Sequence, residues 1–86
     1  MGYAKISISR VIAADPTLNI GDMARLAVLD HEAANGCEFE PDAAARAVQA
    51  MGLDPDGPAA GLPEEMRAEL GHTLEAMETR CASRGE

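Results

Sequence analysis

Three side chains with metal-binding atoms lie close together in the middle of the sequence, namely His31, Glu32 and Cys37. Imidazole nitrogen, carboxylate oxygen and thiolate sulfur are all donors that zinc accepts, but a closed zinc site takes four of them. The spacing of His72 and Cys81 does not place either of them beside this group. Because His31 falls on the apolar side of an expected helix, we interpret it as a structural histidine. We predict no metal site and no other cofactor.

Two other carboxylate patterns are incomplete. Glu69 and His72 form Glu-x-x-His, but a carboxylate-bridged di-iron site needs two such motifs and two further glutamates. On a helical wheel, His72 also faces water. Three ligand positions of a calcium-binding loop are matched by Asp54, Asp56 and Glu65. The sequence lacks the further oxygen ligand and the glycine that such a loop needs between them. Both patterns indicate solvated surface.

The sequence contains no recognisable catalytic motif. Its serines, Ser7, Ser9 and Ser83, lack the Gly-x-Ser-x-Gly turn that presents a nucleophile. It has no glycine-rich loop of the kind that cradles phosphate groups. A helical chain of 86 residues also leaves little room for a concave pocket of the usual size. We therefore predict no enzyme and no catalytic residue.

The strongest signal is acidity, because the chain has a net charge of −8. The charge is concentrated in residues 30–69, which have ten acids against Arg46 and Arg67. A field of this sign repels nucleic acid and anionic membranes and attracts basic surfaces. If two acidic groups converge in space, they form one partner-binding face. Those predicted partner-binding residues are Asp30, Glu32, Glu38, Glu40 and Asp42 in one group, and Glu64, Glu65 and Glu69 in the other.

A helix-turn-helix motif is disfavoured. The segment from Ile20 to Ala27 resembles the start of one, but the gap from Leu29 to Pro41 is far longer than a turn of three or four residues. The second helix would offer only Arg46 and Gln49 to DNA, in an acidic protein. We predict no direct nucleic-acid binding.

The elements that position these side chains are predicted to be helices, because apolar residues recur at helical spacing between short breaks. Asn19 is a good N-cap, Gly36 a typical helix stop, and Gly52 a second one. The expected fold is all-α, a small compact bundle of about four helices in a single domain that spans residues 1–86. The expected helices are residues 3–14, 20–34, 41–51 and 63–83, with a loop over residues 52–62.

Residues 3–8 admit a second interpretation. Ala4, Ile6 and Ile8 alternate with polar residues, which is the pattern of a half-buried strand. The helix is favoured because a lone short strand has nothing to pair with.

The two cysteines, Cys37 and Cys81, have no spacing signature, and small secreted domains usually contain more. No segment is typical of a signal peptide or long and apolar enough to span a membrane. We therefore expect a cytoplasmic protein with both thiols reduced and no membrane partner. The core is thin, with a single Phe and no Trp, which favours dimerisation or docking on a larger partner.

These observations lead to a ranked set of hypotheses. The first is a non-enzymatic protein–protein interaction module, an inhibitor whose acidic face binds a basic, nucleic-acid-binding surface of a larger protein or ribonucleoprotein complex. Its size and composition are of the kind seen among phage-encoded inhibitors, including anti-CRISPR proteins. The second is an accessory or adaptor subunit of a bacterial complex that docks through an apolar helix face. A metal-dependent enzyme or sensor ranks last.

Overall fold

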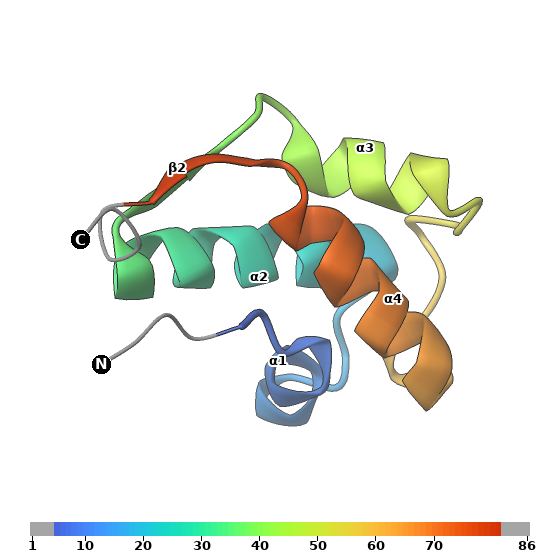
Figure 1. Ribbon diagram of the computed structural model, residues 1–86. Coiled ribbons are helices and arrows are strands. Elements are labelled where there is room, and N and C mark those ends of the chain that lie inside the picture. The colour runs from blue at the N-terminus through green and yellow to red at the C-terminus, as the bar shows by residue number, and fades with distance from the viewer. Residues whose placement is uncertain (1–4, 82–86) are drawn as a thin grey trace.

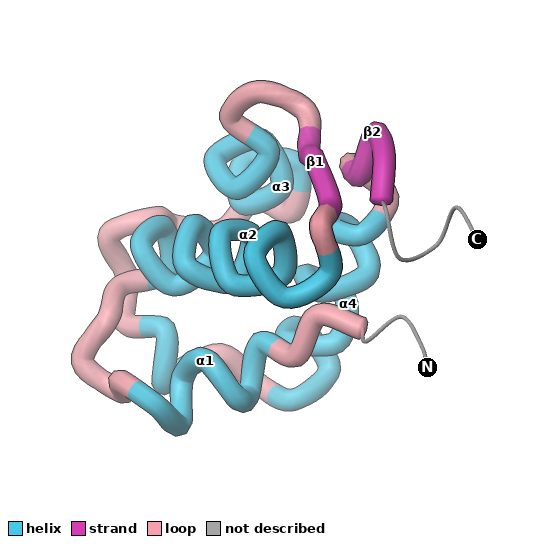
Figure 2. Tube along the Cα trace, turned by 90° about the vertical axis from the view of Figure 1, so that its left-hand side faces the viewer, coloured by secondary structure: helices cyan, strands magenta, loops and turns pink. Residues whose placement is uncertain are grey.

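The computed structural model describes residues 5–81 and consists of four α-helices, one 3-10 turn and two short strands (Figure 1). The long helix α2 lies between α1 and α3, and α4 packs against both of these outer helices (Figures 1 and 2). The strands lie side by side at the C-terminal end of α2 (Figure 2). The elements are α1 Ile8–Ala14, α2 Ile20–Asn35, β1 Cys37–Phe39, α3 Ala43–Ala50, η1 Ala59–Gly61, α4 Glu64–Glu75 and β2 Glu78–Cys81.

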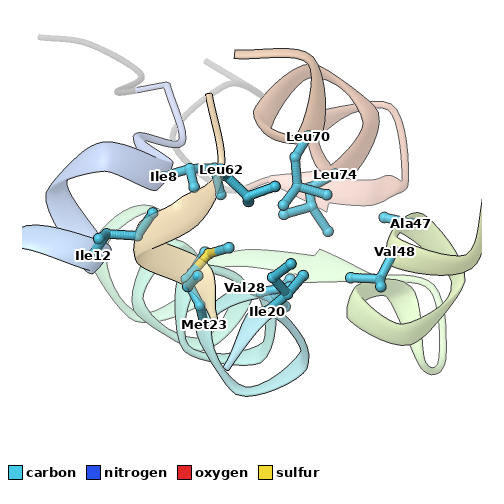
Figure 3. Packing of buried hydrophobic residues seen from close by; sticks show 13 residues of the cluster. Ile8, Ile12, Ile20, Met23, Val28, Ala47, Val48, Leu62, Leu70 and Leu74 are labelled. Carbon is cyan, nitrogen blue, oxygen red and sulfur yellow. The ribbon is translucent and has the colours of Figure 1, made fainter. Parts of the chain in front are cut away.

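The core is aliphatic and receives side chains from all four helices. Met23 of α2, Val48 of α3, and Leu70 and Leu74 of α4 are its largest fully buried side chains. Figure 3 shows Leu70 and Leu74 pointing into the space above the side chains of α2. Each helix buries residues three or four positions apart, so one apolar stripe per helix faces the centre. The burial of these stripes drives the packing.

The limits of α2 follow from its flanking residues, as the sequence predicts. The Asn19 side-chain oxygen accepts a hydrogen bond from the Asp22 backbone N–H at 2.7 Å, which satisfies one of the free donors of the first turn. At the other end, Gly36 adopts the left-handed conformation with φ of 62°. That conformation turns the chain so that β1 begins directly after α2.

Replacing Asn19 with alanine is expected to lower the free energy of unfolding by about 1 kcal/mol, because the first turn of α2 loses its cap. Urea denaturation monitored by circular dichroism measures this change. Asn19→Ser keeps a capping oxygen and serves as the control. If the alanine variant were as stable as the serine variant, backbone contacts alone would fix the start of α2.

The all-α prediction is wrong, because the fold contains a two-stranded antiparallel sheet. The last helix ends at Glu75. Part of the predicted 63–83 helix forms β2 instead, and residues 82 and 83 lie outside the described region. β2 pairs with β1 in the register Cys37–Cys81, Glu38–Arg80 and Phe39–Glu78. A strand that pairs with a distant segment gains backbone hydrogen bonds that no local helical pattern reveals.

The other predicted boundaries shift by smaller amounts. The first helix begins at Ile8, where the Ser7 hydroxyl accepts from the Arg10 N–H at 3.3 Å, while residues 5–7 are neither helix nor strand. Residues 3 and 4 lie outside the described region. The third helix begins at Ala43, because Asp42 adopts a left-handed conformation with φ of 57°. The predicted 52–62 loop includes the η1 turn.

In the part of the chain that the structure describes, no helix has both the length and the apolar character needed to cross a membrane.

Candidate functional site

The first predicted acidic group lies around the C-terminal half of α2, β1 and the loop that follows. Asp30 and Glu38 are exposed, and Glu32 is half-buried. Two members have cations near them. Glu40 Oε1 accepts a hydrogen bond from Arg46 Nη1 at 2.7 Å, and Glu38 is the register partner of Arg80. The fifth member of this group, exposed Asp42, precedes α3. The contact with Arg46 reduces the negative charge that the group presents to a partner.

The second group, Glu64, Glu65 and Glu69, is exposed on α4 and does not join the first. Glu64 and Glu65 open this 12-residue helix, whose other end leads to the sheet. At about 1.5 Å per residue, a helix length of roughly 18 Å separates them from β2. The Ser9 hydroxyl donates to Glu64 Oε2 at 3.5 Å, which places this acid beside α1. Glu64 and Glu65 therefore lie at the end of α4 away from the sheet that contains Glu38.

The exposed side of α2 bears two large apolar side chains. Leu26 is 44% exposed and Leu29 is 53% exposed, and they are the exposed large hydrophobic residues in the described region. They are three positions apart and so share one face of the helix. Exposed Asp22 and Asp30 flank them on the same side. We call this surface, defined by Asp22, Leu26, Leu29, Asp30 and Ala33, the α2 outer face.

A groove of about 390 Å³ separates α1 from α2. Leu26 and Asp30 line it on the α2 side, and Arg10 and Val11 line it on the α1 side. His31 also borders this groove. The α2 outer face is thus continuous with a concave surface, which suits the insertion of an apolar side chain from a partner.

A buried polar cluster joins the end of α2 to both strands. His31 Nε2 lies 2.7 Å from Glu78 Oε2, and the two side chains are only 4% and 3% exposed. The sulfur of buried Cys37 completes the cluster, since one donor atom from each of the three residues lies within 4.8 Å of the others. These are a nitrogen, an oxygen and a sulfur donor, all of which zinc accepts.

Two neighbours fix the orientation of the His31 ring. The Asn35 side-chain nitrogen lies 3.2 Å from His31 Nδ1 and also donates to the His31 carbonyl at 3.3 Å. With the Asn35 amide nitrogen facing Nδ1, the neutral tautomer that satisfies both contacts has its proton on Nε2, on the side of Glu78. The Phe39 ring packs edge-on against His31, with ring centroids 5.8 Å apart. The cluster is therefore held from several sides.

Cys37 is disulfide-bonded, so the expectation of two reduced thiols is wrong for this structure. The sequence contains one other cysteine, Cys81, whose Cα is the register partner of Cys37. The pairing of the strands brings the two positions together, although they are 44 positions apart in the sequence.

The buried cluster contains a residue that the sequence analysis missed. From the sequence alone, His31 and Cys37 are weak ligand candidates, and Glu78 falls in the helix expected over residues 63–83. No sequence signal distinguishes Glu78 from the other acids, since only the β1–β2 register brings it to His31. The residues of the incomplete Glu-x-x-His pattern, Glu69 and His72, are exposed on α4. This agrees with the expectation that His72 faces water.

Comparison of the chain with protein-family models, curated proteins and solved structures gives no match.

Proposed function

We propose that the protein is a non-enzymatic interaction module that docks through the α2 outer face onto a basic surface of a larger protein. The single observation that carries the proposal is the exposure of Leu26 and Leu29, at 44% and 53%, on the same side of α2. Apolar side chains at the centre of an interface supply much of the binding energy once water is excluded around them. The groove beside Leu26 adds concave surface to this face.

Charge determines the chemistry of the partner. The chain carries a net charge of −8, and carboxylates at Asp22 and Asp30 lie on the α2 outer face, while exposed Glu38 lies on β1, which follows α2. A partner with lysines or arginines around an apolar centre complements this arrangement. Basic surfaces of this kind also hold nucleic acid, so docking here blocks nucleic-acid binding by the partner. Docking therefore still inhibits the partner. The binding surface has Leu26 and Leu29 at its centre and carboxylates around them, in place of a single acidic face.

The test is affinity capture from lysate of the source cells, followed by titration of the purified partner against three variants. Leu26→Ser with Leu29→Ser removes the apolar centre and is expected to weaken binding by about 2 kcal/mol, or roughly 30-fold in Kd. Asp30→Asn with Glu38→Gln is expected to slow association and to flatten the dependence of Kd on salt.

The matched control is Glu65→Gln with Glu69→Gln, which removes the same charge from a different helix. It is expected to bind as the wild type does. Equal affinity of the wild type and the double-serine variant would overturn the proposal. Selective loss of binding in the α4 control would instead locate the docking surface on the first turns of α4.

A further inference from the structure

We propose that a second groove, beside the start of α2, binds an arginine side chain of a protein partner. This α2–α3 groove has a volume of about 550 Å³ and lies between the first turns of α2, helix α3 and the loop over residues 53–56. Its volume falls within the range of about 300–1,000 Å³ that is typical of binding pockets. It shares no lining residue with the groove between α1 and α2.

The loop that forms one wall of the α2–α3 groove is fixed to α2 by backbone hydrogen bonds. The Ile20 N–H donates to the Gly57 carbonyl at 2.8 Å, and the Gly21 N–H donates to the Pro55 carbonyl at 2.9 Å. Gly21 permits this close approach, because a Cβ at its position would lie only 3.2 Å from Pro55 Cβ. The groove is therefore formed before a ligand arrives, which reduces the ordering cost of binding.

The same hydrogen bonds disfavour an anion at this end of α2. A helix N-terminus attracts anions through its free backbone N–H groups. Here the N–H groups of Ile20 and Gly21 donate to the loop. The N–H groups of Asp22 and Met23 donate to the side chain and the carbonyl of Asn19, at 2.7 Å and 2.9 Å. The first turn therefore has no free N–H group to offer to an anion in the groove.

The groove has an apolar floor and carboxylates at its rim. Val48 is buried, and Ala44 and Leu53 are half-buried, whereas Asp22 and Asp56 are exposed. An arginine side chain complements both parts, because its aliphatic stem covers apolar surface while its guanidinium donates to carboxylates. A guanidinium is also more weakly hydrated than an ammonium and presents paired donors. These properties favour arginine over lysine as the occupant.

The rim has an excess of negative charge. Exposed Arg25 also lines the groove, so the charged side chains of the lining, Asp22, Arg25 and Asp56, sum to −1. Among the described residues, neither carboxylate forms an ion pair with Arg25 or with another cation. An incoming guanidinium therefore gains its contacts without displacing a cation of the chain itself, and the net charge of −8 adds to the attraction.

The groove and the docking surface are linked by Asp22, which also belongs to the α2 outer face. The inference that the arginine comes from the partner that docks there rests on the proposed function. The binding of arginine by the groove does not, so the experiment uses a small probe in place of the partner.

The experiment is a titration of isotope-labelled full-length protein with acetyl-arginine methylamide, followed by the NMR shifts of the backbone amides. We expect saturable shifts in residues 20–25, 44–49 and 53–56, with a Kd on the order of 1 mM for so small a ligand. Acetyl-citrulline methylamide has the same stem and an uncharged head group of the same shape. It is expected to bind roughly 5-fold more weakly, because it forms no ionic contact with the carboxylates.

Two variants and a matched control test the role of the rim. Asp22→Asn with Asp56→Asn is expected to weaken binding of the arginine probe by roughly 5-fold, since two exposed charge contacts are lost. Arg25→Gln is expected to strengthen it, because a like charge leaves the lining; an anion-binding groove would respond in the opposite direction. Glu65→Gln with Glu69→Gln removes two carboxylates from α4 and should leave the affinity unchanged.

The proposal is overturned if the groove residues show no saturable shift, if the citrulline probe binds as tightly as the arginine probe, or if the double-asparagine variant keeps wild-type affinity. Leu26→Ser with Leu29→Ser should bind the arginine probe as the wild type does. A failure of the docking surface and a failure of the groove therefore give different results.

Discussion

Replacing Cys37 with serine should lower the free energy of unfolding in oxidising, metal-free buffer by about 4 kcal/mol. Cys37 is disulfide-bonded. A disulfide removes conformations from the unfolded chain, and loss of a native disulfide from a small domain typically costs about 2–5 kcal/mol. Guanidinium denaturation of the two proteins measures the difference. The effect is a large fraction of the total stability of a small domain.

Cys37→Ala should be destabilised to the same extent as Cys37→Ser, since either change removes the disulfide. Treating the wild type with a reductant and a chelator should reproduce both variants. If the reduced wild type retained the stability of the oxidised protein, the strand pairing and the His31–Glu78 contact would be sufficient to hold the sheet, and the entropic argument would be wrong for this chain.

His31→Ala should lower the free energy of unfolding by about 3–5 kcal/mol in the oxidised protein. The change leaves the Glu78 carboxylate, 3% exposed, without the imidazole that lies 2.7 Å from it. Removing one partner of a buried hydrogen-bonded contact leaves the other polar group desolvated, which is more costly than losing the contact itself. The variant also loses the edge-on contact with Phe39. Urea denaturation at neutral pH is the measurement.

A double variant separates the charge effect from loss of packing. In His31→Leu with Glu78→Met, both polar groups become apolar, and much of the lost stability should return because no charge remains buried. His72→Ala, an exposed position on α4, should change stability by less than about 0.5 kcal/mol. A double variant less stable than His31→Ala would show that polar contacts in the cluster, including Asn35, contribute more than the buried charge costs.

The features that the sequence predicts correctly are local ones. The start of α2 depends on Asn19 and the Asp22 N–H, three residues apart, and its end depends on the conformational freedom of Gly36. The same holds for the end of α3, where Gly52 has φ of 70° and the Leu53 N–H donates to the Val48 carbonyl at 3.0 Å. Such signals act within one or two helical turns, so they can be recognised in the sequence without knowledge of tertiary contacts.

The sheet and the buried cluster are not local. Leu70, Leu74, Met77 and Cys81 are spaced as one helical stripe, so the sequence pattern continues past Glu75, where the helix ends. Residues 78–81 form a strand because β1 supplies backbone hydrogen-bond partners for them. Tertiary contacts, rather than the local sequence pattern, therefore determine that this segment is a strand and not a helix. Glu78 meets His31 only after this pairing, so the ligand set of the cluster could not be assembled from spacing alone.

The pairing of β1 with β2 also divides the chain into two topologically different parts. The register Cys37–Cys81 closes a long loop that contains α3, η1 and α4, whereas α1 and α2 precede that loop. Closing a long loop costs chain entropy before the contacts between the two strands are gained. Because contacts between distant segments slow folding, we expect the sheet to form late.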